Sequence, residues 1–220
     1  MLVIRKDRGA DPLAFLPADT LALADVRQPA ALYDNFRHSR LGKSFNTIRW
    51  VDLLRQFGVS ADEAGAFQGE VDRLQAFLNG PLFRELFARR VVLALLPDVT
   101  GSRASTVLRD SLVLIASPRH RTEVVELLAP LLPDNHQHVT ETYHGLEIRT
   151  FRLADDLELA IVASDGLLIA SLSAATVKRC LDIDLRQPNP EKSPLSNHPA
   201  YLTLRKQSGG HDDQFVYGDL

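Results

Sequence analysis

The chain has 220 residues, of which 45% are hydrophobic and 24% charged, and it carries a net charge of −3 at pH 7. These values are typical of a globular protein with a substantial core. A nucleic-acid-binding protein usually presents a basic face, so the charge balance argues against nucleic acid as a partner. The single cysteine excludes an internal disulfide. No stretch reaches the ~18 apolar residues of a membrane-spanning helix.

Residues 1–14 are expected to form an N-terminal tail. They begin with the apolar run Met1 to Ile4, which leads directly into the charged run Arg5 to Arg8. An apolar segment with a basic flank is also typical of the last turn of a membrane anchor helix. Two interpretations of residues 1–14 therefore remain open: a short tail or strand, or the remnant of a membrane anchor helix.

The next region is expected to form one strand and then a helical insertion over about 29–88. Thr20–Val26 has the pattern of a strand, and Pro29 suits the first turn of a helix. That helix should end near Gly42. A second helix is predicted over about 44–57.

The third helix of the insertion has the clearest signal. Ser60 and Glu63 form a capping box at its start. Its apolar residues repeat at intervals of three and four, which favours a core-facing stripe over a ligand pocket. These residues are Ala64, Phe67, Val71, Leu74 and Leu78.

The middle of the chain changes to strand patterns. Val91–Leu96 and Ser111–Ser117 are almost continuously apolar, which is typical of strands covered on both faces. A helix beginning at Thr122 is expected to follow. A hairpin over 139–153 then turns at His144 and Gly145, and a change of parity inside its second strand, between Ile148 and Phe151, predicts a β-bulge there.

A second hairpin, over 157–172, is the feature around which we expect the fold to be organised. Asp165-Gly166 between two apolar runs predicts a type I′ turn. This turn pairs Ile161 with Ala170 and makes one face of the hairpin wholly apolar. Ser173 should cap a helix over 174–181, which we expect to pack on that apolar face. Cys180 lies on the inner side of this helix and is expected to be a core residue.

The last part of the chain is predicted to be a linker followed by the start of a further unit. Residues 186–199 are rich in proline and polar side chains. Phe215–Asp219 resembles Leu21–Asp25 in its alternation, and we expect it to begin a second, related unit. The predicted division is therefore a tail over 1–14, an α+β domain over 15–185, and a linker with the start of another unit over 186–220.

Few residues carry a chemical signal. His136 and His138 alternate, with His120 and His144 as additional histidines, but no motif supplies a complete ligand set, so we predict no bound metal. No G-x-S-x-G, P-loop or G-x-G-x-x-G motif is present, and no cofactor is predicted. The one ligand-binding candidate is an anion site just before a predicted helix, with a solvated helix start as the alternative. Its residues are Arg119, His120 and Arg121.

Several segments together resemble a bacterial family known only as domain of unknown function 3352. The similar segments are FLPADTLALADV, LYDNFRHSRLGKSF, LFARRVVLALLP, YHGLEIRTF and DGLLIASLSAATVKRCLD. The resemblance covers roughly residues 13–220 and implies a membrane-anchored protein with an extracytoplasmic region. The family has no established catalytic residues, so the resemblance assigns none here.

Together these patterns predict an α+β fold with a largely antiparallel sheet, helices packed on one face, and the helical insertion. The function we expect is a non-enzymatic, envelope-facing binding or scaffold domain. One alternative is a carrier that holds an apolar ligand between the insertion and the sheet, and another is an unrecognised hydrolase. The expected partner is an unknown protein or an apolar ligand, with the membrane involved only through a missing N-terminal helix.

Overall fold

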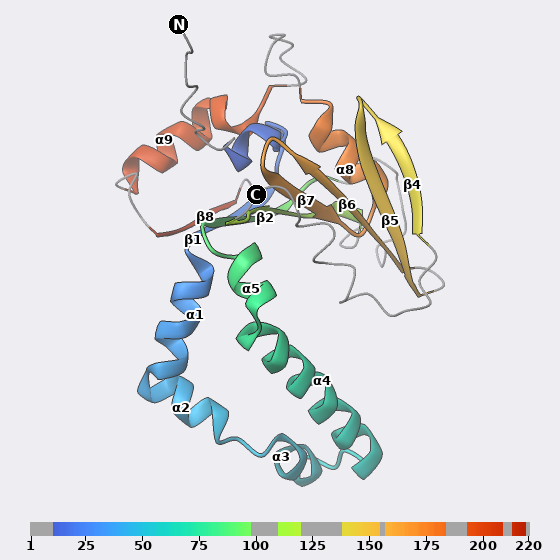
Figure 1. The fold of residues 1–220 in the computed structure, drawn as a ribbon. Coiled ribbons are helices and arrows are strands. Elements are labelled where there is room, and N and C mark those ends of the chain that lie inside the picture. Colours follow the sequence, from blue (N-terminus) through green and yellow to red (C-terminus); the bar gives the residue numbers. More distant parts are fainter. Residues whose placement is uncertain are drawn as a thin grey trace, which may run out of the picture.

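The protein is built on one eight-stranded antiparallel sheet (Figure 1). The structure, a computed structural model, describes residues 11–97, 110–119, 138–154, 157–183, 193–208 and 213–218. The strand order is β4-β5-β6-β7-β3-β2-β1-β8. The strands are β1 (Ala22–Arg27), β2 (Arg90–Leu95), β3 (Leu112–Ser117), β4 (His138–Tyr143), β5 (Leu146–Ala154), β6 (Leu157–Ser164), β7 (Leu167–Ser171) and β8 (Gln214–Gly218). With helices packed against this sheet, the predicted α+β fold is confirmed.

The two predicted hairpins are present, and their four strands, β4 to β7, form one antiparallel meander. Asp165 and Gly166 have φ of 50° and 77°, as a type I′ turn requires, and Ile161 pairs with Ala170. The predicted bulge is misplaced, because the register shift in β5 lies between Arg152 and Ala154. The change of parity between Ile148 and Phe151 has another cause: Ile148 is buried on one face of the sheet and Phe151 on the other.

Helices pack on both faces of the sheet, and this overturns one prediction. Helix α8 (Ala174–Leu181) packs through Val177 and Cys180 on the face that carries Val162 and Ile169. The prediction that α8 packs on the opposite face, which carries Leu168, is therefore wrong. That face is instead covered by the end of the helical insertion. We name the two sides of the sheet the α8 face and the α5 face, after helix α8 and after helix α5 (Pro81–Leu86) at the end of the insertion.

The helical insertion is present and projects from the sheet as an arm (Figure 1). It leaves the end of β1 and returns at β2, where the Gln28 amide donates to the Arg89 carbonyl at 2.7 Å. Its helices are α1 (Pro29–His38), α2 (Arg40–Asn46), α3 (Trp50–Gln56), α4 (Ala61–Asn79) and α5 (Pro81–Leu86). The capping box of Ser60 and Glu63 is confirmed. The predicted 44–57 helix is wrong in extent, since α2 ends at Asn46 and α3 starts at Trp50.

Both ends of the described chain contribute to the main core. The short 3₁₀ helices η1 (Pro12–Phe15) and η4 (Leu195–Asn197) contact each other, and Leu16 and Leu195 are fully buried in one cluster. Helix α9 (Pro199–Gln207) follows, and β8 pairs with β1 in the same sheet. The described parts of 186–220 thus pack with the α+β domain, as do Leu13 and Ala14 from the predicted tail. A further unit after Leu220 stays a prediction.

Candidate functional site: a helical arm with exposed apolar residues

In the described structure, the residues that the sequence singled out for anion or metal binding do not form a site. Arg119 is exposed, and its amide donates to the Glu85 carbonyl at 3.0 Å. His120 and Arg121 lie outside the described residues, as do His136 and the predicted helix at Thr122, so the anion site stays a prediction. His138 and His144 flank opposite ends of β4, about 20 Å apart at the rise of a strand. Among the described residues no group of three His, Cys, Asp or Glu side chains could hold a metal.

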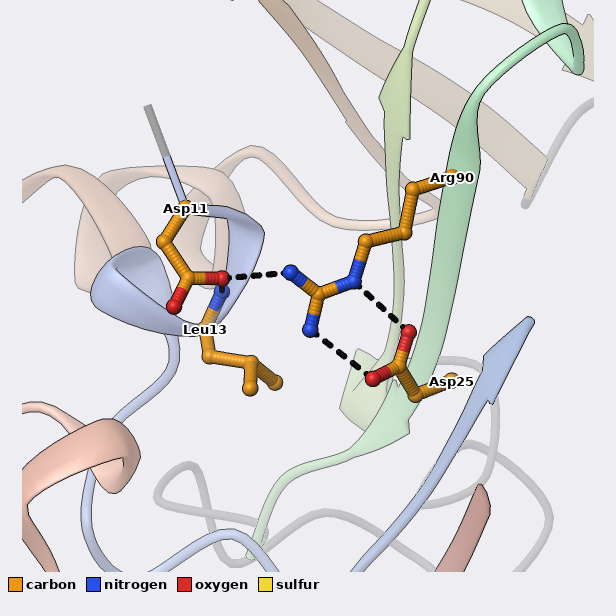
Figure 2. Close-up of polar contacts among 4 residues, drawn as sticks. All are labelled: Asp11, Leu13, Asp25 and Arg90. Carbon is orange, nitrogen blue, oxygen red and sulfur yellow. Dashed lines mark hydrogen bonds and ion pairs between the residues drawn. The ribbon is translucent and has the colours of Figure 1, made fainter. Parts of the chain in front are cut away.

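A partly buried ion pair joins β1 to β2, and sequence patterns did not indicate it. Figure 2 shows the Arg90 guanidinium between two carboxylates. Its Nε and Nη2 each donate to Asp25 at 2.8 Å, and its Nη1 donates to Asp11 at 2.7 Å. Burial acts to lower the pKa of Arg90, but the hydrogen bonds and charges of Asp25 and Asp11 outweigh it and raise that pKa. Because all three of its nitrogens donate, the guanidinium fastens β1 and Asp11, the N-cap residue of η1, to β2, which is a structural role.

Cys180 is a second buried group, and its environment argues against a nucleophile. Burial among apolar side chains raises the pKa of its thiol from 9.0 to about 12. The expected core position on the inner side of α8 is confirmed. A thiolate is the reactive form of cysteine, so this thiol is held in its unreactive state.

We therefore predict that Cys180, the one cysteine of the chain, is not labelled in the folded protein at pH 8 by a chromogenic disulfide reagent. After unfolding in guanidinium it should react at once, which serves as the control. Because the thiol pKa is higher in the folded state than in the unfolded state, stability should fall as pH rises from about 9 toward 12. Stoichiometric labelling of the folded protein within minutes would contradict this assignment.

The arm is fastened at its base by aromatic packing. Phe83 of α5 lies edge-on to Tyr33 of α1, with ring centroids 5.6 Å apart, and stacks on Phe87 at 4.9 Å. Phe77 at the end of α4 contacts both phenylalanines. Arg37 of α1 also donates a hydrogen bond to Asn79 of α4. These contacts hold the two ends of the arm together beside the sheet.

Farther from the sheet, a line of aromatic rings joins the remaining helices. The ring centroids of Phe36 and Phe45 are 6.3 Å apart, those of Phe45 and Trp50 5.3 Å, and those of Trp50 and Phe67 6.0 Å. Gly42 is required where α2 meets α1, since a Cβ there would lie 2.0 Å from the Phe36 carbonyl oxygen. The corner between α1 and α2 is therefore a specific packed structure, and it holds Phe36 and Phe45 in contact.

Despite these contacts the arm has no closed core. Between residues 29 and 80 only Gly42 and Ala64 are buried. The prediction that the apolar stripe of α4 is buried in a core is wrong, since Phe67 is 44% exposed and Leu74 56% exposed. The stripe has the spacing of a core helix, but the arm extends past the sheet and no second layer covers it. Eight of the fourteen exposed large hydrophobic residues in the described chain lie here: Phe36, Leu41, Phe45, Ile48, Leu53, Phe57, Phe67 and Leu74.

Comparison with known proteins adds little to this picture. No protein-family model matches the sequence, and no curated protein is significantly similar to it. One solved structure, crystal form III of TP0453, is similar with a TM-score of 0.41 and 10% sequence identity. The match covers 95% of this chain and 63% of that one, so this chain spans less than two thirds of its length.

Proposed function

We propose that the protein is a non-enzymatic binding module that docks an apolar partner surface with its helical arm. The observation that carries the proposal is that the arm buries only Gly42 and Ala64 between residues 29 and 80. Single exposed apolar side chains are common on protein surfaces, but a joined set usually marks an interaction site. The rings from Phe36 through Phe45 and Trp50 to Phe67 are in contact, so this set is joined.

The sheet supports the arm as a rigid base. Leu86 of α5 packs on the α5 face with Ile161 and Leu168, so the arm is joined to a well-packed core at one end and open at the other. Aromatic residues held in place by their neighbours lose little conformational freedom on binding and commonly dominate binding energy. An envelope-facing location remains part of the proposal through the family resemblance alone.

A second proposal is that the protein carries an apolar ligand, and exposed apolar residues on the α5 face of the sheet support it. Val216 on β8 and Leu93 on β2 both pair with Ala24, lie on the α5 face, and are 79% and 40% exposed. A ligand held between the arm and the sheet would cover this apolar strip. At α5, however, arm and sheet are already in direct contact through Leu86 and Leu168, so such a ligand would have to lie toward β1, β2 and β8.

Nile red tests the first proposal, because this uncharged dye fluoresces when it enters an apolar site. We expect the native protein to bind the dye and the double variant Leu41→Ser/Phe57→Ser to lose most of that signal. The matched control is Leu202→Ser/Val216→Ser, which removes two exposed apolar residues outside the arm and should leave the signal unchanged. Circular dichroism would check that each variant keeps its helices. Equal dye binding by both double variants would overturn the proposal, and loss in the control alone would favour the carrier.

A further inference from the structure

The part of the arm farthest from the sheet is basic as well as apolar. We define the tip as residues 40–57, which comprise α2, α3 and the residues between and after them (Figure 1). It has four basic residues and one acidic residue, so its net charge is +3, whereas the whole chain has −3. All five charged residues are exposed: Arg40, Lys43, Arg49, Asp52 and Arg55. Asp52 is paired with Arg49, at 2.9 Å.

The tip also carries the most exposed apolar side chains of the arm. Phe57, directly after α3, is 79% exposed, and Leu41 in α2 is 69% exposed. Phe45, Ile48 and Leu53 are also exposed, and Trp50 is half-buried among them. Short helices that combine basic residues with Trp, Phe and Leu are typical of segments that lie in the interface of a lipid bilayer.

The charge on α4 distinguishes the tip from the rest of the arm. Residues 60–79 have four acidic residues and one basic residue, a net charge of −3. An anionic surface would therefore attract the tip more strongly than α4, whose first acidic residues, Asp62 and Glu63, lie next to α3. Among the described residues, none of the helices qualifies as a membrane-spanning segment.

We propose that the tip docks on the surface of an anionic phospholipid bilayer, with Leu41, Phe57 and Trp50 entering the interfacial region and the basic side chains contacting lipid phosphates. This inference rests on the proposed function and names its partner. An acidic protein surface is a different partner. The bilayer is favoured because two consecutive short helices and the residue after them carry both exposed basic residues and exposed Leu and Phe side chains, and because Trp50 has the amphipathic ring that membrane interfaces favour.

Co-sedimentation with vesicles tests the proposal. The full chain is mixed with vesicles of phosphatidylcholine alone or of phosphatidylcholine with phosphatidylglycerol as a minority lipid. We expect binding to the anionic vesicles, weakened by added salt because surface charges are screened. Arg40→Gln/Lys43→Gln should weaken that binding by at least about tenfold, since each basic residue near an anionic surface contributes on the order of 1 kcal/mol. Leu41→Ser/Phe57→Ser should weaken it comparably.

Two control variants match these changes outside the tip. Arg89→Gln/Lys206→Gln removes two exposed basic residues and Leu202→Ser/Val216→Ser removes two exposed apolar residues; both should bind vesicles like the native protein. Arg40→Gln/Lys43→Gln should also keep its Nile red signal, which shows that the arm is intact.

Several outcomes would overturn the membrane inference. If vesicles are not bound, or if neutral vesicles are bound as well as anionic ones, the inference fails while arm-dependent Nile red binding still supports the proposed function. If the tip variants abolish a concentration-dependent dimer and vesicles are not bound, the partner is a second copy of the chain. If Nile red binding itself is independent of the arm, the proposed function fails.

Discussion

Replacing Arg90 with alanine should lower the free energy of unfolding by about 3–5 kcal/mol. The substitution removes the bidentate partner of Asp25, whose side chain is 1% exposed. A carboxylate this far from water has little solvent to replace the lost hydrogen bonds, so the folded state retains an uncompensated charge. Chemical denaturation of the native protein and of the variant, followed by circular dichroism, measures the difference.

Two further variants separate the buried pair from ordinary surface charges. Arg84→Ala removes an arginine that lies 3.6 Å from Asp34, in a pair whose side chains are 58% and 41% exposed, and should cost at most about 1 kcal/mol. The double variant Asp25→Leu/Arg90→Met removes both buried charges and should be more stable than Arg90→Ala alone. A loss for Arg90→Ala no larger than that for Arg84→Ala would show that the pair does not hold η1 and β1 to the sheet.

Leu168→Ala should lower the free energy of unfolding by about 2–5 kcal/mol. Leu168 is 4% exposed and lies on the α5 face in a cluster with Leu86 of α5 and Val91 of β2. Truncation leaves a cavity where the base of the arm meets the sheet, and surrounding strands and helix can close it only in part. Denaturation measures the loss.

The control for this substitution is Leu202→Ala on the exposed side of α9, where the side chain is 50% exposed and the effect should stay within about 0.5 kcal/mol. A loss for Leu168→Ala in that same small range would mean that α5 does not pack on the sheet as the structure has it. The arm would then lack its rigid base, and the proposed function would lose its structural support.

The elements that sequence predicted well are those whose signals are local. The turn at Asp165-Gly166 follows from residues that tolerate positive φ, and the capping box at the start of α4 follows from Ser60 and Glu63. The continuous apolar character of β2 and β3 likewise predicted two strands inside the sheet, although Leu93 of β2 is 40% exposed on the α5 face. In each case the residues that determine the feature lie within a few positions of one another.

The features that sequence left open depend on contacts between distant residues. β6 has apolar residues on both faces, with Val162 on one and Ile161 on the other, so its pattern did not decide which face α8 would cover, and the prediction that α8 covers Leu168 is wrong. The Arg90–Asp25 pair joins residues 65 positions apart. The chain has many arginines, and nothing near Arg90 in the sequence indicates that it pairs with Asp25.

The exposure of the arm shows most clearly how a locally determined feature differs from one that depends on contacts between distant residues. By itself, the sequence determined that α4 is a helix with an apolar stripe, because helical spacing and capping are local properties. Only the tertiary structure decided that Phe67 and Leu74 in this stripe stay exposed, because burial requires a second layer. The same stripe spacing would be found in a helix packed against a sheet. Here the chain leaves the sheet at Pro29 and returns at Arg90, so the apolar stripe extends beyond the sheet that would otherwise have covered it.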